Sequence, residues 1–143
     1  MPDQKFSGAL LAFDFGTQHI GVAVGQSITG TARGVATLKA RDGAPAWRHV
    51  KDLLDTYRPA LLVVGLPLNM DGTASAIADQ ARQFAALLEQ KADLNVAMQD
   101  ERLTTVQAKE QLDWARAADK ANTDHELAAC FIAEDWLAAN AAL

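Results

Sequence analysis

The sequence predicts a single α/β domain with a mixed five-stranded sheet and helices on both of its faces. Residues 9–25 have the pattern of two apolar strands around a short glycine-containing turn, and residues 31–40 follow as a third strand. Two more apolar runs, residues 61–66 and 94–99, alternate with helical patterns, as parallel strands do. A three-stranded meander followed by two parallel strands forms a mixed sheet, which we expect to be covered by helices on both faces.

The helices are predicted from apolar residues that recur three or four positions apart. Such residues occupy four segments: residues 47–57, residues 77–88, a segment opened by the capping box of Thr104 and Gln107, and residues 127–136. Pro59 ends the first helix, and Pro67 follows the fourth strand. The predicted order is therefore β-β-β-α-β-α-β-α-α in one domain, residues 1–143, with a core at about residues 8–138.

Composition indicates an ordinary globular protein. Half of the 143 residues are hydrophobic and 22% are charged, and no apolar run approaches the roughly 18 residues of a membrane span. The polar N-terminus lacks the apolar segment of a signal peptide, and Cys130, the single cysteine, allows no internal disulfide. We therefore expect a cytoplasmic protein without membrane contact, in which Cys130 is a small core residue.

The formal net charge of −5 argues against a protein that coats nucleic acid through overall positive charge. It is compatible with a nuclease, in which acidic residues hold cations while local basic residues hold the nucleic-acid backbone. One stretch is locally basic: Arg33, Lys39, Arg41, Arg48 and Lys51. This stretch is interpreted either as such a backbone contact or as an ordinary solvated surface.

Acidic residues stand where the predicted strands and helices end. Asp14 ends the first strand inside an apolar run, where an ionised carboxylate is costly to bury unless it is paired or binds a metal. Asp100 and Glu101 follow the strand of residues 94–99, and Asp124 begins the last helix. Because functional groups gather beyond the carboxyl ends of parallel strands, we expect Asp14 and Glu101 side by side.

Converging carboxylates without a histidine or cysteine cluster suit hard cations, so we expect Mg²⁺ or Mn²⁺. Two such ions about 4 Å apart would stabilise the attacking and leaving oxygens of phosphoryl transfer. Each acid also has a purely structural interpretation. Asp14 could accept turn N–H groups, and Glu101 could pair with Arg102. Asp124 could favour the helix dipole beside a capping box of Thr123 and Glu126.

Three separated segments carry a family resemblance. They are Phe-Asp-Phe-Gly-Thr-Gln-His-Ile-Gly-Val-Ala-Val-Gly at residues 13–25, Val-Gly-Leu-Pro-Leu-Asn-Met-Asp-Gly-Thr at residues 64–73, and Asp-Glu-Arg-Leu-Thr-Thr-Val-Gln-Ala at residues 100–108. They resemble the YqgF (RuvX) family of Holliday-junction-resolvase-like nucleases, also described as pre-16S rRNA nucleases. Residues 128–137 are similar to the last helix of that family. The resemblance covers residues 8–137 and implies a ribonuclease H-like fold.

The resemblance implies Asp14 and Glu101 as catalytic, metal-binding carboxylates. At the place of the family's third acid this sequence has His125, and Asp124 lies one residue earlier. Neighbouring helical residues point about 100° apart, so only one of these two can face Asp14. We predict Asp124 as the third catalytic and metal-binding acid, because three oxygen ligands suit Mg²⁺ better than a set with imidazole. His125 is the alternative.

Substrate-binding groups are expected in the second motif and directly after the second acid. Asn69, Gly72 and Thr73 could present N–H and polar groups to a phosphate. The alternative for this loop is a turn without a role in binding. Arg102 could clamp the scissile phosphate with its planar guanidinium group, or pair with Asp100 instead.

These features predict a metal-dependent endonuclease that acts on structured nucleic acid. The resemblance points to processing of the 5′ end of pre-16S rRNA, with Holliday-junction resolution in branched DNA as the alternative. The expected partners are pre-rRNA, branched DNA and ribosomal particles, and the protein itself is expected to be a monomer or a weak homodimer.

Two other classes of protein compete with the nuclease. Residues 14–17 also resemble the first phosphate loop of actin-like ATPases and sugar kinases, which need a second lobe that 143 residues do not supply. A non-catalytic RNA- or ribosome-associated binding module is the other alternative, because the third acid is irregular. His19 and His49 are interpreted as exposed side chains without a role.

Overall fold

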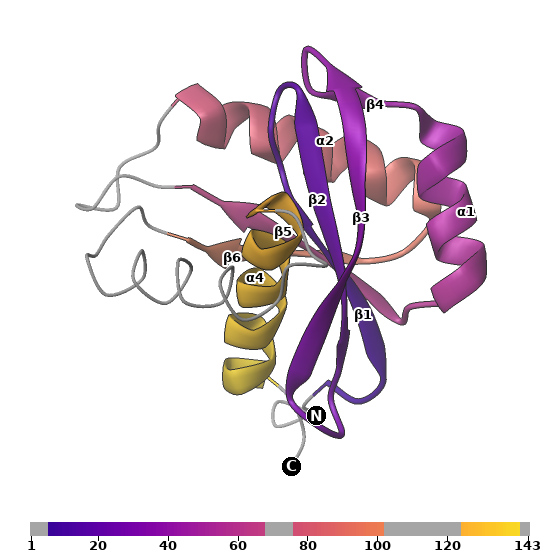
Figure 1. The fold of residues 1–143 in the computed structure, drawn as a ribbon, viewed down its shortest axis with the longest axis vertical. Helices are drawn as coiled ribbons and strands as arrows, with labels where there is room; N and C mark the ends of the chain where they lie inside the picture. Colours follow the sequence, from indigo (N-terminus) through magenta and orange to yellow (C-terminus); the bar gives the residue numbers. More distant parts are fainter. Residues whose placement is uncertain (1–5, 68–75, 102–123, 141–143) are drawn as a thin grey trace.

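The computed structural model describes residues 6–67, 76–101 and 124–140 (Figure 1). The strands are β1 (Ala9–Asp14), β2 (His19–Gln26), β3 (Thr31–Arg41), β4 (Ala44–Pro45), β5 (Leu61–Leu66) and β6 (Val96–Asp100). The helices in these ranges are α1 (Trp47–Tyr57), α2 (Ala76–Ala92) and α4 (Asp124–Asn140). No helix in the described part of the chain is long and apolar enough to cross a membrane.

The strands form one sheet in the order β4-β3-β2-β1-β5-β6. β1 to β4 pair antiparallel in chain order, whereas β5 runs parallel to both β1 and β6. The predicted mixed sheet, with a meander and two parallel strands, is confirmed. The predicted number of five strands is wrong by one, because β4 has only two residues and leaves no alternating pattern in the sequence.

Most predicted elements lie close to the observed ones. The helices predicted at residues 47–57 and 77–88 are α1 and α2, and the last predicted helix is α4. The strand expected at residues 94–99 begins two residues later, as β6. Cys130 is buried in the core, as predicted. The helix expected to open at Thr104 lies outside the described residues.

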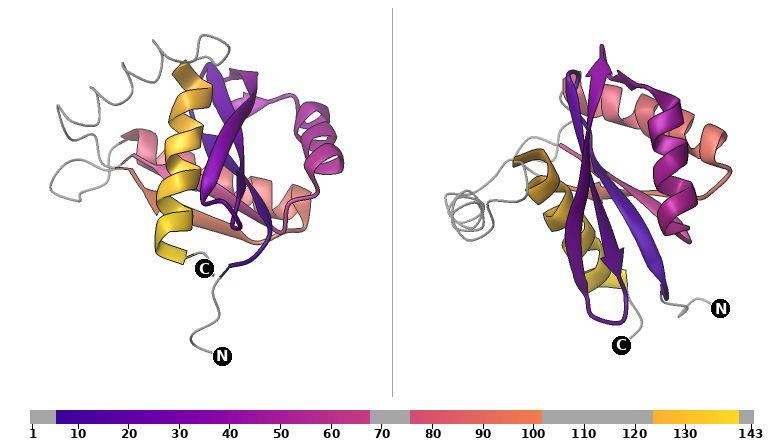
Figure 2. Two further views of the ribbon diagram at one scale, coloured as in Figure 1. Left: turned by 60° about the horizontal axis from the view of Figure 1, so that its bottom comes forward. Right: turned by 45° about the vertical axis from the view of Figure 1, so that its right-hand side comes forward.

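The two faces of the sheet have different helices: α1 and α2 cover one face, and α4 covers the other (Figure 2). Alternate residues of a strand point to opposite faces. Leu11 and Phe13 of β1 belong to the core beneath α1 and α2, whereas Leu10 and Ala12 belong to the core beneath α4. Asp14 continues the second series, so its side chain lies on the α4 face.

Two glycines allow α4 to lie close to the sheet. A Cβ atom at Gly21 of β2 would overlap the backbone carbonyl oxygen of His125, in the first turn of α4. A Cβ atom at Gly65 of β5 would collide with the side chain of Ile132. Because Gly21 is the sheet partner of Asp14, this packing brings the beginning of α4 beside the end of β1.

Candidate active site

The two acids that the sequence predicts at strand ends lie at one edge of the sheet and on one of its faces. Asp14 ends β1, and Glu101 directly follows β6, on the other side of the parallel neighbour β5. The Glu101 amide donates a hydrogen bond to the carbonyl oxygen of Leu66, 2.9 Å away, which extends the pairing of β5 and β6. Ala97 of β6 belongs to the core beneath α4, so Gln99 and Glu101 face α4 as well.

Asp14 is largely withdrawn from water. Burial raises the pKa of its carboxyl group from 3.8 to about 6. Among the residues that the structure describes, no N–H group or cationic side chain is a partner of this carboxylate. The structural interpretation, in which Asp14 accepts turn N–H groups, therefore finds no donor in this part of the chain. An ionised Asp14 needs a positive partner, which a bound cation would supply.

Glu101 has the more strongly perturbed carboxyl group. Burial is the largest cause that raises its pKa to about 8, followed by the hydrogen bond with Asp135 and by the charges of Asp135, Asp100 and Asp14. Its Oε1 atom is buried and has no hydrogen-bond partner within the described ranges. The action of the Asp14 charge on Glu101 makes the two predicted site acids electrostatic neighbours.

Asp135 is a member of this acidic group that the sequence did not reveal. It lies on α4, one helical turn after Ile132, the residue that packs on Gly65. The same Gly65 position is 3.6 Å from Cγ of Glu101, measured from an ideal Cβ atom. Asp135 therefore reaches Glu101 from the helix, where its hydrogen bond and its charge both raise the pKa of the Glu101 carboxyl group. The three-residue spacing from Ile132 to Asp135 could have indicated this position only if the contact of Ile132 with Gly65 were already known.

The beginning of α4 contains the two candidates for the third site residue. Asp124 is exposed, whereas the ring of His125 stacks on the ring of His19 from β2, with 5.1 Å between centroids and 20° between planes. His19 is exposed as predicted, but it has a partner that the sequence did not indicate. No three acids, histidines or cysteines among the described residues lie close enough together to hold a metal ion. The choice of Asp124 over His125 stays a prediction.

Glu126 ties the first turn of α4 to the sheet. Its Oε2 atom accepts a hydrogen bond from the hydroxyl group of Thr37, 3.0 Å away. Thr37 is the sheet partner of Gly21, which is in turn the partner of Asp14. The contact therefore holds the beginning of the helix over β2 and β3, next to the end of β1. The alternative capping box needs Thr123, which lies outside the described residues.

Four predicted substrate-binding residues also lie outside the described residues: Asn69, Gly72, Thr73 and Arg102. Their assignments stay predictions. The described neighbours show where the chain leaves the sheet, because β5 and β6 both end at the edge that carries Asp14. Pro67 and Glu101, the last described residues after these two strands, therefore lie at the edge of the candidate site.

The two site acids offer carboxylate oxygen atoms as donors to a ligand. The one ion pair within the described ranges, between Arg82 and Asp79, is on α2 and involves neither site acid. Two buried carboxylates close together repel each other when both are ionised. A hard divalent cation removes this repulsion and prefers such ligands. Asp14 and Glu101 are the residues that could hold it from the sheet.

Solved structures show the same fold at low sequence identity. The structure of Thermus thermophilus RuvC in complex with a Holliday junction substrate matches with a TM-score of 0.56 and 17% identity, over 92% of this chain and 95% of that one. The yeast mitochondrial Holliday junction resolvase matches with a TM-score of 0.52 and 9% identity, over 94% of this chain and 79% of that one. The fold is therefore that of ribonuclease H-like resolvases.

Sequence relatives are much closer. A Glaesserella parasuis protein named "Putative pre-16S rRNA nuclease" is 50% identical over 133 residues, which cover 91% of this chain and 96% of the relative. A Yersinia pestis protein of the same name is 49% identical over 130 residues, 89% of this chain and 92% of the relative. The model of the RuvX family, described as Holliday junction resolvase, matches residues 8–139. The chain therefore belongs to the RuvX (YqgF) family.

Proposed function

We propose that this protein is a metal-dependent endonuclease that hydrolyses phosphodiester bonds in structured nucleic acid. The observation that carries the proposal is the pair of partly buried carboxyl groups, Asp14 and Glu101, at one edge and on one face of the sheet. Membership of the RuvX family supports the nuclease class. The names of the relatives at 49–50% identity favour the 5′ end of pre-16S rRNA as the substrate.

The residues present fit a hard divalent cation, Mg²⁺ or Mn²⁺. Carboxylate oxygens are the ligands that these ions prefer, and neither imidazole nor thiolate is needed from the two strand ends. The buried Oε1 atom of Glu101 lacks a hydrogen-bond partner in the described part of the chain, which is costly unless another group reaches it. A ligand oxygen aimed at a cation fits this observation.

In the proposed mechanism the chain's own groups hold and orient the reacting parts. Asp14 and Glu101 would hold the cation from the sheet, while Asp135 orients the Glu101 side chain from α4. When bound, the cation would lower the pKa of the attacking water and stabilise the departing 3′ oxygen. Because its pKa is raised, Glu101 keeps a proton near neutral pH and must lose it before it can hold a cation. Cation binding is therefore expected to strengthen as the pH rises.

A third ligand and the substrate contacts belong to the proposal as well. Asp124 is proposed as the third acid, and His125 is the alternative. The ring of His125 stacks on His19, so it is less free to turn toward the site. Asn69, Gly72, Thr73 and Arg102 are proposed to contact the phosphate backbone.

Cleavage of two substrates by the full-length protein tests the proposal. One substrate is an RNA that contains the 5′ end of pre-16S rRNA, and the other is a four-way DNA junction, each with Mg²⁺ or with EDTA. We expect Mg²⁺-dependent cleavage of the RNA, and a loss of about a hundredfold or more in Asp14→Asn and Glu101→Gln. Asp79→Asn is the matched control, because Asp79 is an exposed acid on α2, on the other face of the sheet.

The outcomes separate the parts of the proposal. Unchanged cleavage by Asp14→Asn would exclude this site, and binding of RNA without cleavage would favour the non-catalytic module. Cleavage of the junction alone would leave the nuclease correct and the substrate wrong. In the same assay Asp124→Asn should abolish cleavage while His125→Ala is tolerated; the reverse pattern would assign the third position to His125.

A further inference from the structure

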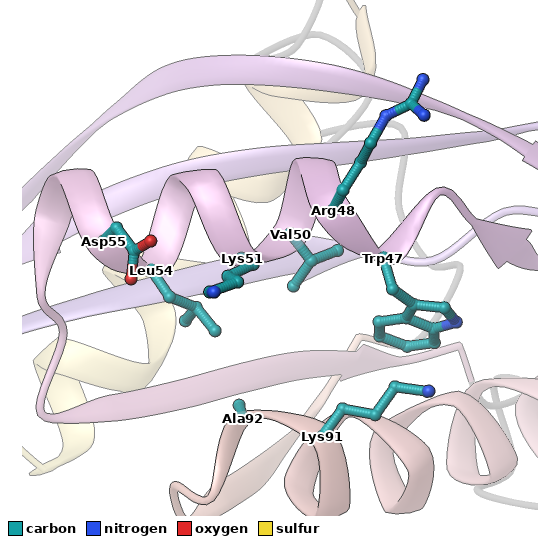
Figure 3. A pocket seen from close by; sticks show the side chains of 8 residues that line it. All are labelled: Trp47, Arg48, Val50, Lys51, Leu54, Asp55, Lys91 and Ala92. Carbon is teal, nitrogen blue, oxygen red and sulfur yellow. The ribbon is translucent and has the colours of Figure 1, made fainter.

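A second candidate site lies on the opposite face of the sheet, between α1 and the last turn of α2. A cavity of about 520 Å³ lies at this place, and Figure 3 shows the side chains that line it. Its walls are apolar, and they include Trp47, Val50 and Leu54 from α1 and Ala92 from α2. The volume falls in the range of small-molecule sites, roughly 300–1,000 Å³. The sheet separates this cavity from Asp14, because α1 and α2 cover the other face (Figure 2).

The rim of the cavity is basic in a chain that is acidic overall. Arg48, Lys51 and Lys91 line it together with a single acid, Asp55, whereas the whole chain has a net charge of −5. None of the three cations takes part in the one ion pair found within the described ranges. Lys51 and Asp55 are one helical turn apart without forming a salt bridge. The rim therefore carries three cations and one acid, with no salt bridge among these described residues.

The aromatic wall of the cavity is held in place from within the core. The Trp47 ring stacks on Phe84 of α2, with 5.9 Å between centroids and 19° between planes. The ammonium group of Lys91 lies 5.2 Å from the centroid of the Trp47 ring, a cation–π contact. In Figure 3, Lys51 lies along the side of α1 that faces α2, next to Leu54, and Lys91 lies beneath Trp47, whereas Arg48 points away from α2. Two ammonium groups on opposite helices thus flank an apolar, aromatic-walled space.

We propose that this cavity binds a nucleoside phosphate, with the phosphate between Lys51 and Lys91 and the base against the wall of Trp47 and Leu54. Phosphate alone would satisfy the cations, but it would leave the apolar wall uncovered. A flat ring joined to an anion would satisfy the cations and cover the apolar wall, as in single-strand binding sites that combine basic and aromatic groups. The ligand is either a free nucleotide or one nucleotide of a strand. The proposal does not depend on cleavage at Asp14.

Titration followed on the Trp47 indole tests the proposal where the ligand would bind. The full-length protein carries three tryptophans, so the indole N–H signals in a ¹⁵N-correlated NMR spectrum are few, and Trp47→Phe assigns the one at the cavity. Adenosine 5′-monophosphate, a five-nucleotide RNA and inorganic phosphate are added separately in EDTA. The RNA titration uses Asp14→Asn, which keeps the cavity and removes the candidate active site. We expect the nucleotide to shift the Trp47 signal more strongly than inorganic phosphate does.

Charge removal supplies the decisive comparison. Lys51→Ala combined with Lys91→Ala should weaken nucleotide binding by about tenfold or more, since hydrogen bonds to charged groups are lost. Arg82→Ala is the matched control, because it removes one exposed cation from α2 outside this cavity. Both lysines are exposed, so the fold should persist, and Lys51→Ala alone should give a smaller loss in the same direction.

Two patterns support the proposal and identify the source of the ligand. Binding of the mononucleotide that depends on both lysines points to a free nucleotide, and binding of the RNA alone with the same dependence points to a strand. Equal affinity for inorganic phosphate and the mononucleotide would overturn the assignment, since the aromatic wall would then contribute nothing. Absence of any shift at Trp47, or an equal loss in Arg82→Ala, would overturn it too.

Discussion

Burial raises the pKa of Asp14 to about 6 and that of Glu101 to about 8, so the folded protein retains protons that the unfolded chain releases near pH 4. Stability falls with rising pH wherever the folded state binds more protons than the unfolded state. Without metal, we therefore expect the melting temperature to fall from about pH 4 to pH 8. Asp14 contributes to this fall in melting temperature up to about pH 6, and Glu101 contributes to it up to about pH 8. Thermal unfolding in EDTA across this range measures the effect.

Neutral variants isolate the two acids in that experiment. Asp14→Asn and Glu101→Gln should melt above the wild type by a margin that grows with pH, because the amide does not ionise. Asp135→Asn should shorten the sensitive range at its upper end, since Asp135 is among the causes that raise the pKa of Glu101. Asp79→Asn should follow the wild type at every pH. A margin that stays constant from pH 4 to pH 8 would show that these acids do not titrate as described.

The sequence was sufficient to bring Asp14 and Glu101 together at the candidate site, but it did not indicate Asp135. Asp14 and Glu101 were predictable because each is next to an apolar strand, and parallel strands bring their carboxyl ends to one edge. Asp135 was not, because nothing along the chain tells which face of α4 meets the end of β6. The stacking of His19 on His125 has the same origin, since it joins residues that only the packing of α4 on β2 brings together.

At the scale of elements, the position of α4 depends on the absence of a side chain at Gly21. Gly21→Ala should destabilise the protein by about 1–3 kcal/mol, because the new methyl group meets the backbone of His125 rather than a movable side chain. The displaced helix start should also reduce Mg²⁺-dependent cleavage, since Glu126 and its neighbours flank Asp14. Chemical denaturation and the cleavage assay measure the two effects.

Gly25→Ala is the matched control for this prediction. Gly25 is on the same strand and faces the same helix, but a Cβ atom there meets only side chains, of Leu137, Ala133 and Leu10, at 3.1–3.3 Å. Its loss of stability should be smaller, and its cleavage should stay near that of the wild type. Equal losses in the two variants would mean that the first turn of α4 yields easily and does not fix the site.

Element by element, the sequence predicted what periodicity can show. The buried strand of residues 61–66 and the helix of residues 47–57 have full patterns and were found at their predicted bounds. β4 was missed because a hairpin pair of two residues has no period. The glycines that admit α4 were read only as part of a motif, since close approach between two distant elements leaves no local pattern.

Over the whole molecule, the sheet divides two chemistries. The carboxyl groups lie on the α4 face, and the basic cavity lies on the face of α1 and α2. The basic stretch predicted from the sequence is distributed accordingly. Arg48 and Lys51 line the cavity, while Arg33 of β3 lies over the ring of Tyr57, 5.8 Å from its centroid. The sequence predicted both the strand and the helix that carry these residues, but it did not show that Arg48 and Lys51 line a cavity.

Amide hydrogen exchange in the central strand β1 measures global unfolding, and it therefore provides a measure of cation binding that is independent of activity. β1 is paired on both sides, and Leu10 to Phe13 are fully buried, so their amides should exchange with solvent only through global unfolding. A cation that binds only the folded state raises the free energy of unfolding by mass action. At a Mg²⁺ concentration ten times the dissociation constant, exchange in β1 should therefore slow by about elevenfold.

The location of the bound cation follows from the same hydrogen-exchange measurement, made at one pH on the wild type and on Asp14→Asn. Amides at the short edge strand β4 exchange through local opening, so Mg²⁺ should leave them unchanged in both proteins. The slowing in β1 should disappear in Asp14→Asn and persist in Asp79→Asn, because only the first variant removes a ligand from the candidate site. If β1 slows equally in Asp14→Asn, the cation binds elsewhere on the fold, and the carboxyl groups at the strand ends are not its ligands.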